Sequence, residues 1–427
     1  MFKLIGGEKL IVGIDISDEY MQISYCVNNS ENNVETLSMT TGAENFNIPV
    51  VLLKREGVNQ WFFGRDALKI HAGEGGILFK NLLSLAVDGE PVRVEGVQIE
   101  PTALLTLFMK RSIGLLSQAQ PSDRIYALAV TCRNPGNGRA EALSQAVQGL
   151  KLKTDRIFIQ GYEESFYNYM LYQPEELWSA GALLMEYASG HVKTCRLDLN
   201  RHTVPAVVHI DEEEYPFEVY TPAGGEDSIP AELVRMDREF LAICGENCEE
   251  RQFSVVYLIG EEFTGEWMKQ SLRYLCRGRR VFQGSNLYSK GACFGVLERI
   301  KPGDMGKTHV FMGRDKLKSN IRMKLFRQGE EIYYSILDAG INWFEAEKSF
   351  DFYIQDGNSL EIYISSLVGK GNRIARIILE ELPDGPARLH AGFSMSTPER
   401  LTVELEDMGL GAMRAATHRV WREDMEV

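Results

Sequence analysis

The feature that most limits the possible fold of this chain is a run of alternating strand and helix signals between residues 125 and 171. It opens with Ile125–Thr131, an apolar segment typical of a strand that is buried on both faces. A turn rich in Asn, Pro and Gly follows, and apolar residues then recur at helical spacing over 140–150. A short strand, Arg156–Ile159, leads into a second helix that begins at Glu163. This order predicts an α/β fold in which helices cover a sheet.

Composition indicates an ordinary globular protein and disfavours some partners. A chain of 427 residues allows one to three domains with sizeable cores. Its hydrophobic content of 44% and charged content of 25% are close to the average for globular domains. The net charge of −14 argues against a nucleic-acid partner, which would need basic patches. No run reaches the ~18 apolar residues of a membrane span, and no secretory signal is evident, so we expect a cytoplasmic protein without a membrane partner.

The seven cysteines are scattered without the spacing of a zinc site. Cys244 and Cys248 are close in sequence, but no second cysteine pair and no histidine pair completes a ligand set. The sequence therefore predicts reduced thiols and no metal site of this kind.

The segment AVTCRNPGNGRAEALSQAVQGLKLKTDRIFIQGYEESFYNYML, residues 129–171, resembles the connecting segment of Hsp70-type ATPase domains. The shared features are a valine-rich strand, a proline turn, a long helix, a second strand and a Glu-Pro-Thr motif. Glu163 and Ser165 match the Glu and the Thr of that motif, whereas Glu164 replaces its proline. The resemblance implies an actin-like ATPase fold with two ribonuclease-H-like lobes.

The first phosphate loop of the superfamily is matched by Leu10–Ile16 and the turn after it. Asp15 stands in the place of the family's aspartate, but Ser17-Asp18-Glu19 replaces a small Gly-Thr-Thr turn. A phosphate cradle needs free backbone N–H groups and room for close approach. Two carboxylates facing a polyanion would oppose binding, unless Asp18 and Glu19 point into water at the tip of the hairpin.

The second phosphate loop is matched by residues 180–199, which we expect to repeat the first hairpin. Glu186 aligns with the loop's first aspartate, and Ser189 and Gly190 remain of its small residues. In the region of the family's nucleoside-binding glycines, the chain offers Gly260 followed by two glutamates. Farther on, Gly291 matches a small residue that packs closely in the closing helix of the family.

The resemblance implies candidate site residues of two kinds. The candidate catalytic residues are Asp15, Glu163 and Glu186, and the candidate cofactor-binding residues are Ser17, Ser189, Gly190 and Gly260. The cofactor would be ATP or ADP with Mg²⁺. Because most loop glycines and acidic groups are replaced, we expect binding to be weak or absent and the chain to be a pseudo-ATPase.

From Ile321 onward the apolar period changes to two, which predicts several antiparallel strands in a β-sandwich. This part is similar to the substrate-binding sandwich of Hsp70 proteins, which implies a protein or an extended peptide as partner. The expected organisation is a nucleotide-binding-type domain over 1–303 with a shortened second lobe, a linker over 304–319, a sandwich over 320–411 and a short tail over 412–427. That tail is too short for the helical lid of the family.

Three functions remain open from the sequence. The first is a chaperone-type or regulatory interaction protein with a degenerate ATPase site. The second is an active ATP-dependent chaperone of the Hsp70 type. The third is a small-molecule phosphotransferase of the same superfamily, which the fused sandwich disfavours.

Overall fold

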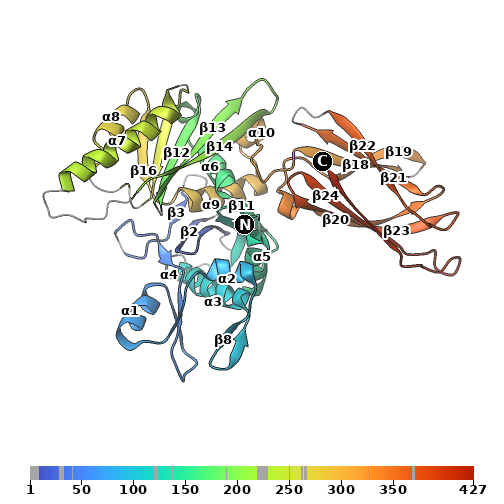
Figure 1. Cartoon of the computed structure of the whole chain (residues 1–427), viewed down its shortest axis with the longest axis horizontal. Coiled ribbons are helices and arrows are strands. Elements are labelled where there is room, and N and C mark those ends of the chain that lie inside the picture. Colours follow the sequence, from blue (N-terminus) through green and yellow to red (C-terminus); the bar gives the residue numbers. More distant parts are fainter. Residues whose placement is uncertain are drawn as a thin grey trace, which may run out of the picture. The chain divides into compact units, whose positions relative to one another are not determined.

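A computed structural model describes residues 9–27, 33–40, 42–119, 124–136, 138–188, 190–218, 229–249, 251–260, 263, 267–327, 329–367 and 371–427. The chain divides into two compact units, Met1–Phe311 and Met312–Val427. Both contain the structures expected in broad terms: the first is mixed α/β and the second is built from antiparallel strands (Figure 1). None of the helices in the described ranges is long and apolar enough to cross a membrane.

The first sheet of unit one is built on a buried hairpin. Its order is β11-β10-β1-β2-β3, with β4 also paired to β2. Strand β1 is antiparallel to β2 and parallel to β10, and β10 is parallel to β11. Every residue of β1 is buried, as expected for an apolar strand covered on both faces. The bounds are β1 (Leu10–Ile16), β2 (Tyr20–Val27), β3 (Glu35–Thr36), β4 (Ile48–Pro49), β10 (Ile125–Cys132) and β11 (Ile157–Gly161).

The second sheet repeats the topology of the first. Its order is β16-β15-β12-β13-β14, and β17 is added beside β14. Strand β12 is again antiparallel to the next strand and parallel to a later one. We call 9–161 the first lobe and 182–284 the second lobe. The bounds are β12 (Ala182–Ala188), β13 (His191–Asn200), β14 (Ala206–Pro216), β15 (Val255–Ile259), β16 (Arg280–Gly284) and β17 (His309–Phe311).

Two helices, α6 (Tyr162–Leu171) and α9 (Leu287–Ile300), are exchanged between the lobes. Helix α6 follows the first sheet but packs its Phe166 into the core of the second. Helix α9 follows the second sheet but packs against strands β1, β2 and β10 of the first. The helices cross where Gly291 meets Ser165, because a Cβ at Gly291 would overlap the Ser165 carbonyl oxygen. The expected close packing at Gly291 is thus confirmed, and both helices lie between the two sheets (Figure 1).

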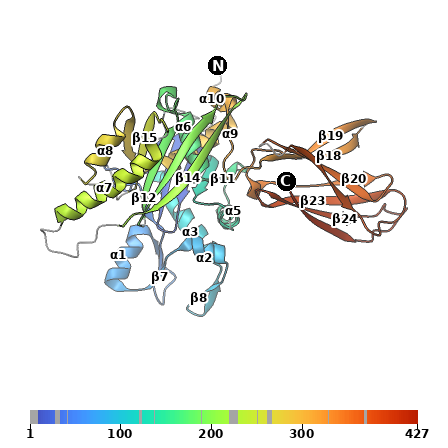
Figure 2. The same ribbon diagram turned by 45° about the horizontal axis from the view of Figure 1, so that its top comes forward.

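The insertions in the two lobes differ. In the described part of the first lobe, a small sheet, a hairpin and helices α1 to α4 lie between β3 and β10, and α5 joins β10 to β11. In the second lobe α7 and α8 cover the face of the sheet opposite α6 (Figure 2). The bounds are β5 (Leu52–Lys54), β6 (Trp61–Phe63), α1 (Gly64–Glu74), β7 (Ile77–Phe79), α2 (Leu82–Asp88), β8 (Val92–Val94), β9 (Val97–Ile99), α3 (Pro101–Gly114), α4 (Leu116–Ala119), α5 (Arg139–Gly149), α7 (Ile229–Cys248) and α8 (Gln270–Leu275).

The segment 304–319, expected as a linker, is structured at its start. It forms α10 (Asp304–Thr308) and β17, which extends the second sheet by pairing in parallel with β14. Phe311 is buried there and stacks on Tyr167 with ring centroids 5.2 Å apart. Val310 and Phe311 thus belong to a strand, and the boundary between the compact units follows Phe311.

Unit two is a sandwich of two four-stranded antiparallel sheets. Their orders are β19-β18-β21-β22 and β20-β23-β24-β25. Alternate residues point inward, so that Ile362, Leu389 and Val403 lie in one core. The antiparallel character predicted from the period of two is confirmed. The bounds are β18 (Ser319–Arg327), β19 (Glu330–Leu337), β20 (Glu347–Ile354), β21 (Ser359–Ser366), β22 (Asn372–Ile378), β23 (Ala387–Thr397), β24 (Arg400–Asp407) and β25 (Val420–Glu426).

The residues expected as a short tail, 412–427, complete the second sheet of the sandwich. Strand β25 pairs along β24, and Trp421 packs into the core while its Nε1 donates to the Glu380 carbonyl oxygen at 3.0 Å. The connection is held by the buried Asp407 carboxylate, which accepts hydrogen bonds from the backbone N–H and the hydroxyl of Thr417. The expected tail is therefore corrected to a strand.

Candidate functional site

Asp15 and Glu186 occupy corresponding places in the two lobes. Each lies near the C-terminal end of the first strand of its sheet, opposite Gln22 in one hairpin and Lys193 in the other. Both carboxyl groups are buried, with exposed fractions of 1% for Asp15 and 8% for Glu186. The repeated topology thus brings these two sequence-predicted residues to one region between the lobes.

Two tyrosines connect these carboxyl groups. The Tyr162 hydroxyl donates to Asp15 Oδ1 at 2.7 Å, and the Tyr288 hydroxyl donates to Glu186 Oε2 at 3.1 Å. Their rings stack with centroids 3.9 Å apart and an angle of 13° between the planes. Tyr162 begins α6 and Tyr288 lies in the first turn of α9, so the exchanged helices place them face to face. The result is a continuous chain of contacts from one lobe to the other.

Arg133 adds an ion pair between the lobes. It follows β10 of the first lobe, and its guanidinium lies 2.5 Å from Glu186 Oε2 in the second. The same guanidinium lies over the Tyr162 ring, 5.1 Å from its centroid. Glu186 therefore receives a hydrogen bond and an ion pair from groups of the protein itself.

Burial governs the protonation of this cluster. It raises the pKa of Asp15 from 3.8 to about 7, with a further increase from Glu186, against the Tyr162 hydrogen bond and Arg133. Burial also raises the pKa of Tyr162 and of Tyr288 well above the ordinary value, so both hydroxyls stay protonated and donate. Burial disfavours the charge on Arg133, but the charge and hydrogen bond of Glu186, together with Tyr288 and Tyr162, outweigh burial and raise the Arg133 pKa. With a pKa of about 7, Asp15 is about half protonated at pH 7.

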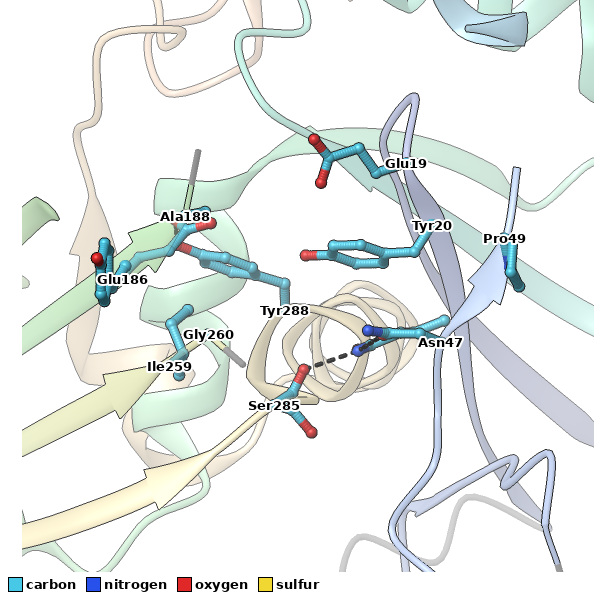
Figure 3. Close-up of a pocket in the computed structure, with 12 residues that line it drawn as sticks. Glu19, Tyr20, Asn47, Pro49, Glu186, Ala188, Ile259, Gly260, Ser285 and Tyr288 are labelled. Atoms are coloured by element: carbon cyan, nitrogen blue, oxygen red, sulfur yellow. Dashed lines mark hydrogen bonds between the residues drawn. The ribbon is translucent and has the colours of Figure 1, made fainter. Parts of the chain in front are cut away.

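A cavity of about 260 Å³ opens beside this cluster. Tyr20 approaches it from the β2 side with its hydroxyl directed toward Tyr288, which projects from α9 (Figure 3). Glu19 lies at its edge on the turn of the first hairpin. The lining residues are Glu19, Tyr20, Gln22, Asn47, Pro49, Glu186, Tyr187, Ala188, Ile259, Gly260, Ser285 and Tyr288.

The turn after β1, which was aligned with a phosphate loop from the sequence, is closed by its own hydrogen bonds. The Ser17 N–H donates to the Tyr20 carbonyl oxygen at 2.9 Å. The Ser17 hydroxyl accepts from the N–H groups of Glu19 and Tyr20, each at 3.2 Å. Asp18 is turned toward α2, where it accepts from the Ser84 N–H at 3.0 Å and from its hydroxyl at 2.5 Å. The N–H groups of Ser17, Glu19 and Tyr20 thus already have acceptors within the turn, and only Glu19 of the two acidic residues borders the cavity.

The remaining predicted residues are dispersed. Gly260 borders the cavity at a φ of 120°, where a Cβ would overlap the Tyr187 carbonyl oxygen. Gly190 forms the β12–β13 turn at a φ of 76° and is not among the lining residues. Glu163 is buried in the first turn of α6; the pKa of Cys195 is raised chiefly by burial, and Glu163 makes a minor contribution. Ser189 lies outside the described residues, as do the two glutamates that follow Gly260.

The arrangement of Asp15 and Glu186 does not fit a hydrated magnesium ion or a nucleoside triphosphate. Glu186 is paired with Arg133, and Asp15, which is about half protonated at pH 7, accepts a hydrogen bond from Tyr162. Within the described part of the chain, no group of three or more His, Cys, Asp or Glu side chains is arranged to hold a metal ion. A magnesium site needs free oxygen ligands, which this arrangement does not provide.

A second cavity lies in the sandwich and has a different character. Its volume is about 980 Å³, and it is bordered by β18, β19, β20 and β21. Leu325, Tyr334 and Phe350 supply apolar surface, and Phe326 and Tyr353 line it while being 75% and 64% exposed. Exposed aromatic side chains beside an open groove are typical of surfaces that bind other proteins or peptides.

The comparisons with known proteins divide the chain at nearly the same place as the structure. The model of a family of unknown function, DUF5716 (C-terminal), matches residues 33–314. The chain belongs to the DUF5716 family. A domain of unknown function, DUF8552, matches residues 316–427. No curated protein matches the chain.

The central residues of the site in this DUF5716 chain were not recognised from sequence. Arg133 lies in a segment that showed only turn signals, and neither Tyr162 nor Tyr288 was singled out. One signal was available: each tyrosine lies in the first turn of the helix that follows the last strand of its repeat. An alignment of the two halves on Asp15 and Glu186 is the comparison that would have paired them.

Proposed function

We propose that unit one is an Hsp70-like, actin-type scaffold with a degenerate ATPase site, and that the chain is a cytoplasmic chaperone-type or regulatory protein that binds protein partners. The repeated sheet topology supports the scaffold, because the fold that the resemblance implies has two similar lobes. The net charge of −14 fits a protein or peptide partner better than a nucleic acid.

One observation carries the proposal: Glu186 is neutralised by Arg133 and bonded by Tyr288. In an ATPase of this superfamily the nucleotide and its magnesium ion lie between the lobes and connect them. In this chain, side chains of the protein make that connection. Displacing Arg133 from Glu186 leaves a buried charge unpaired, which is strongly unfavourable. The cleft is thereby closed to phosphate without any ligand.

The nucleotide part of the proposal is tested by calorimetry on the full chain with ATP and ADP, with and without Mg²⁺. We expect dissociation constants above about 100 μM and no measurable hydrolysis. The matched variant restores the family turn through Ser17→Gly, Asp18→Thr and Glu19→Thr, together with Arg133→Ala. Tighter ATP binding by this variant supports an eroded ATP site. Micromolar, Mg²⁺-dependent binding and hydrolysis by the unmodified chain would instead establish an active ATPase.

The interaction part assigns partner binding to the groove of the sandwich. Phe326 and Tyr353 offer apolar contacts to an extended peptide, and the neighbouring strands offer backbone hydrogen bonds. In fluorescence anisotropy with a labelled extended apolar peptide, Phe326→Ser and Tyr353→Ser should each weaken binding about tenfold. Ile374→Ser and Ile378→Ser are matched controls, because these exposed side chains lie on β22 and do not line the groove. Equal losses in both pairs would count against the groove.

A further inference from the structure

The polar chemistry of the cavity between the lobes suits a cation and not an anion. Among the described residues that line it, Glu19 and Glu186 carry negative charge, and none is Lys, Arg or His. Glu186 is buried and paired with Arg133, and Glu19 is exposed to solvent at the edge of the cavity. An approaching anion would therefore meet a carboxylate, and an approaching cation would be attracted to it.

Gln22 provides an independent sign of a ligand. Its side chain is 1% exposed and lines the cavity. The Nε2 group donates to Asn47 Oδ1 at 2.7 Å and to the Ser285 carbonyl oxygen at 2.8 Å, which uses both of its hydrogens. Because the Ser285 carbonyl only accepts, the orientation of the amide is determined. Its Oε1 has no hydrogen-bond partner within the described structure. A buried oxygen without a hydrogen bond reduces the stability of the fold, and an N–H group of a ligand could supply the missing bond to Gln22 Oε1.

Aromatic rings complete the cavity. Tyr20 and Tyr288 both line it, and Tyr20 projects from the same strand as Gln22. The electron-rich face of a tyrosine ring attracts ammonium and guanidinium groups. Carboxylate, amide oxygen and ring face together form a recognisable set of partners for an organic cation.

We propose that this cavity binds a small organic cation that carries N–H donors, a primary ammonium or a guanidinium, with an N–H on Gln22 Oε1 and the charge near Tyr20 and Glu19. The volume of about 260 Å³ limits the ligand to a small molecule. The inference rests on the proposed function in one respect, namely that the cleft does not take a nucleotide. It adds a ligand class for the same cleft.

The experiment titrates the full chain with agmatine, which carries both an ammonium and a guanidinium, by calorimetry at low salt. Agmatine should bind with a dissociation constant below about 1 mM. Tetramethylammonium has the charge but no N–H, and it should bind at least about fivefold more weakly because it cannot satisfy Gln22. Equal affinities, or no agmatine binding up to about 10 mM, would overturn the proposal.

Two variants test the assigned contacts. Glu19→Gln should weaken agmatine binding about threefold to fivefold, whereas Glu90→Gln, another exposed carboxylate outside the cavity, should leave it unchanged. Gln22→Met should reduce the preference for agmatine over tetramethylammonium, with folding checked by circular dichroism. Unchanged binding in the Glu19 variant would contradict the proposal even if the Gln22 variant does not fold.

Two further arms separate the alternatives. An alanine-based peptide with one lysine supplies the same chemistry, so tighter binding of that peptide than of n-butylamine would overturn the assignment to a small molecule. ATP is titrated in parallel. If neither agmatine nor ATP binds, only this inference is refuted. If agmatine does not bind but ATP binds with micromolar affinity, the proposed function is refuted as well.

Discussion

The rings of Tyr162 and Tyr288 stack 3.9 Å apart, although the two residues belong to helices that follow different sheets. Their hydroxyls point in opposite directions along the chain of contacts, to Asp15 in one lobe and to Glu186 in the other. A change in the charge of either carboxyl group is therefore transmitted to the packing of the helices. This arrangement makes the cleft sensitive to pH and to single substitutions.

Replacing Arg133 by Gln should destabilise unit one by about 2–3 kcal/mol, because Glu186 would keep a buried charge without its cation. The effect is set below that of a fully buried pair, since the Arg133 side chain is 33% exposed. Urea denaturation followed by fluorescence measures the free energy of unfolding. Arg251→Gln is the control, because its ion pairs with Asp198 and Asp211 are exposed and should contribute less than about 1 kcal/mol.

The Asp15 variant should reveal a dependence on pH. Because burial raises the pKa of Asp15 from 3.8 to about 7, the stability that comes with its protonated form is present at low pH and is lost as pH rises through about 7. Asp15→Asn removes this loss, so the variant should gain about 2–3 kcal/mol relative to the unmodified chain between pH 5 and pH 8. Denaturation at both pH values measures the difference. The exposed Asp88→Asn variant should show no such change.

Close packing at the helix crossing predicts opposite effects for two glycine substitutions. Gly291→Ala should destabilise unit one by at least about 1–3 kcal/mol, because the added Cβ overlaps the Ser165 carbonyl oxygen in the backbone of α6. Gly114→Ala, at the end of α3, meets no atom within 4 Å and should stabilise by up to about 1 kcal/mol. Thermal melts of the two variants provide the comparison. A neutral Gly291 variant would show that the helices can separate without cost.

The role of β25 predicts the behaviour of fragments. A fragment over 312–427 should fold alone, because its core is made within the sandwich. Removal of 419–427 should cost about 3 kcal/mol or more, since Trp421 leaves the core and the β24 edge is exposed. Circular dichroism melts of both fragments decide the point. Identical melting temperatures of the two fragments would show that residues 419–427 do not stabilise the sandwich.

Much of the architecture could be predicted because it is encoded locally. The buried strands β1 and β10 appear as continuous apolar runs, and the sandwich strands appear as alternation. Strand β25 escaped detection because it is an edge strand. Glu423 stands opposite the buried Val403 but remains exposed, so the alternating pattern is interrupted. Edge positions tolerate such residues, and a single sequence does not distinguish them from a tail.

The site could be predicted only in part, since its contacts join distant residues. Asp15 and Glu186 were found through the resemblance to the two phosphate loops, and each lies near the end of an apolar strand. Arg133 lies 53 residues from Glu186, and Tyr162 lies 147 residues from Asp15. Neither contact can therefore be predicted from a local sequence pattern. The orientation of Asp18 toward Ser84 is likewise a tertiary contact. The chemistry of the cleft is therefore a property of the fold.

The exchange of α6 and α9 between the lobes has a consequence for how the chain assembles. The Ser24 hydroxyl in β2 is paired with the Ser289 hydroxyl, 265 residues later, and Gly13 faces the backbone of Cys293 in α9. The first sheet is thus without one of its covering layers until nearly all of unit one has left the ribosome. Such distant contacts slow folding, because the entropy cost of closing long loops comes before the free energy gained by burying apolar surface. During synthesis the apolar face of β1 and β10 stays exposed, and this nascent intermediate is the form in which the protein itself is most prone to aggregate.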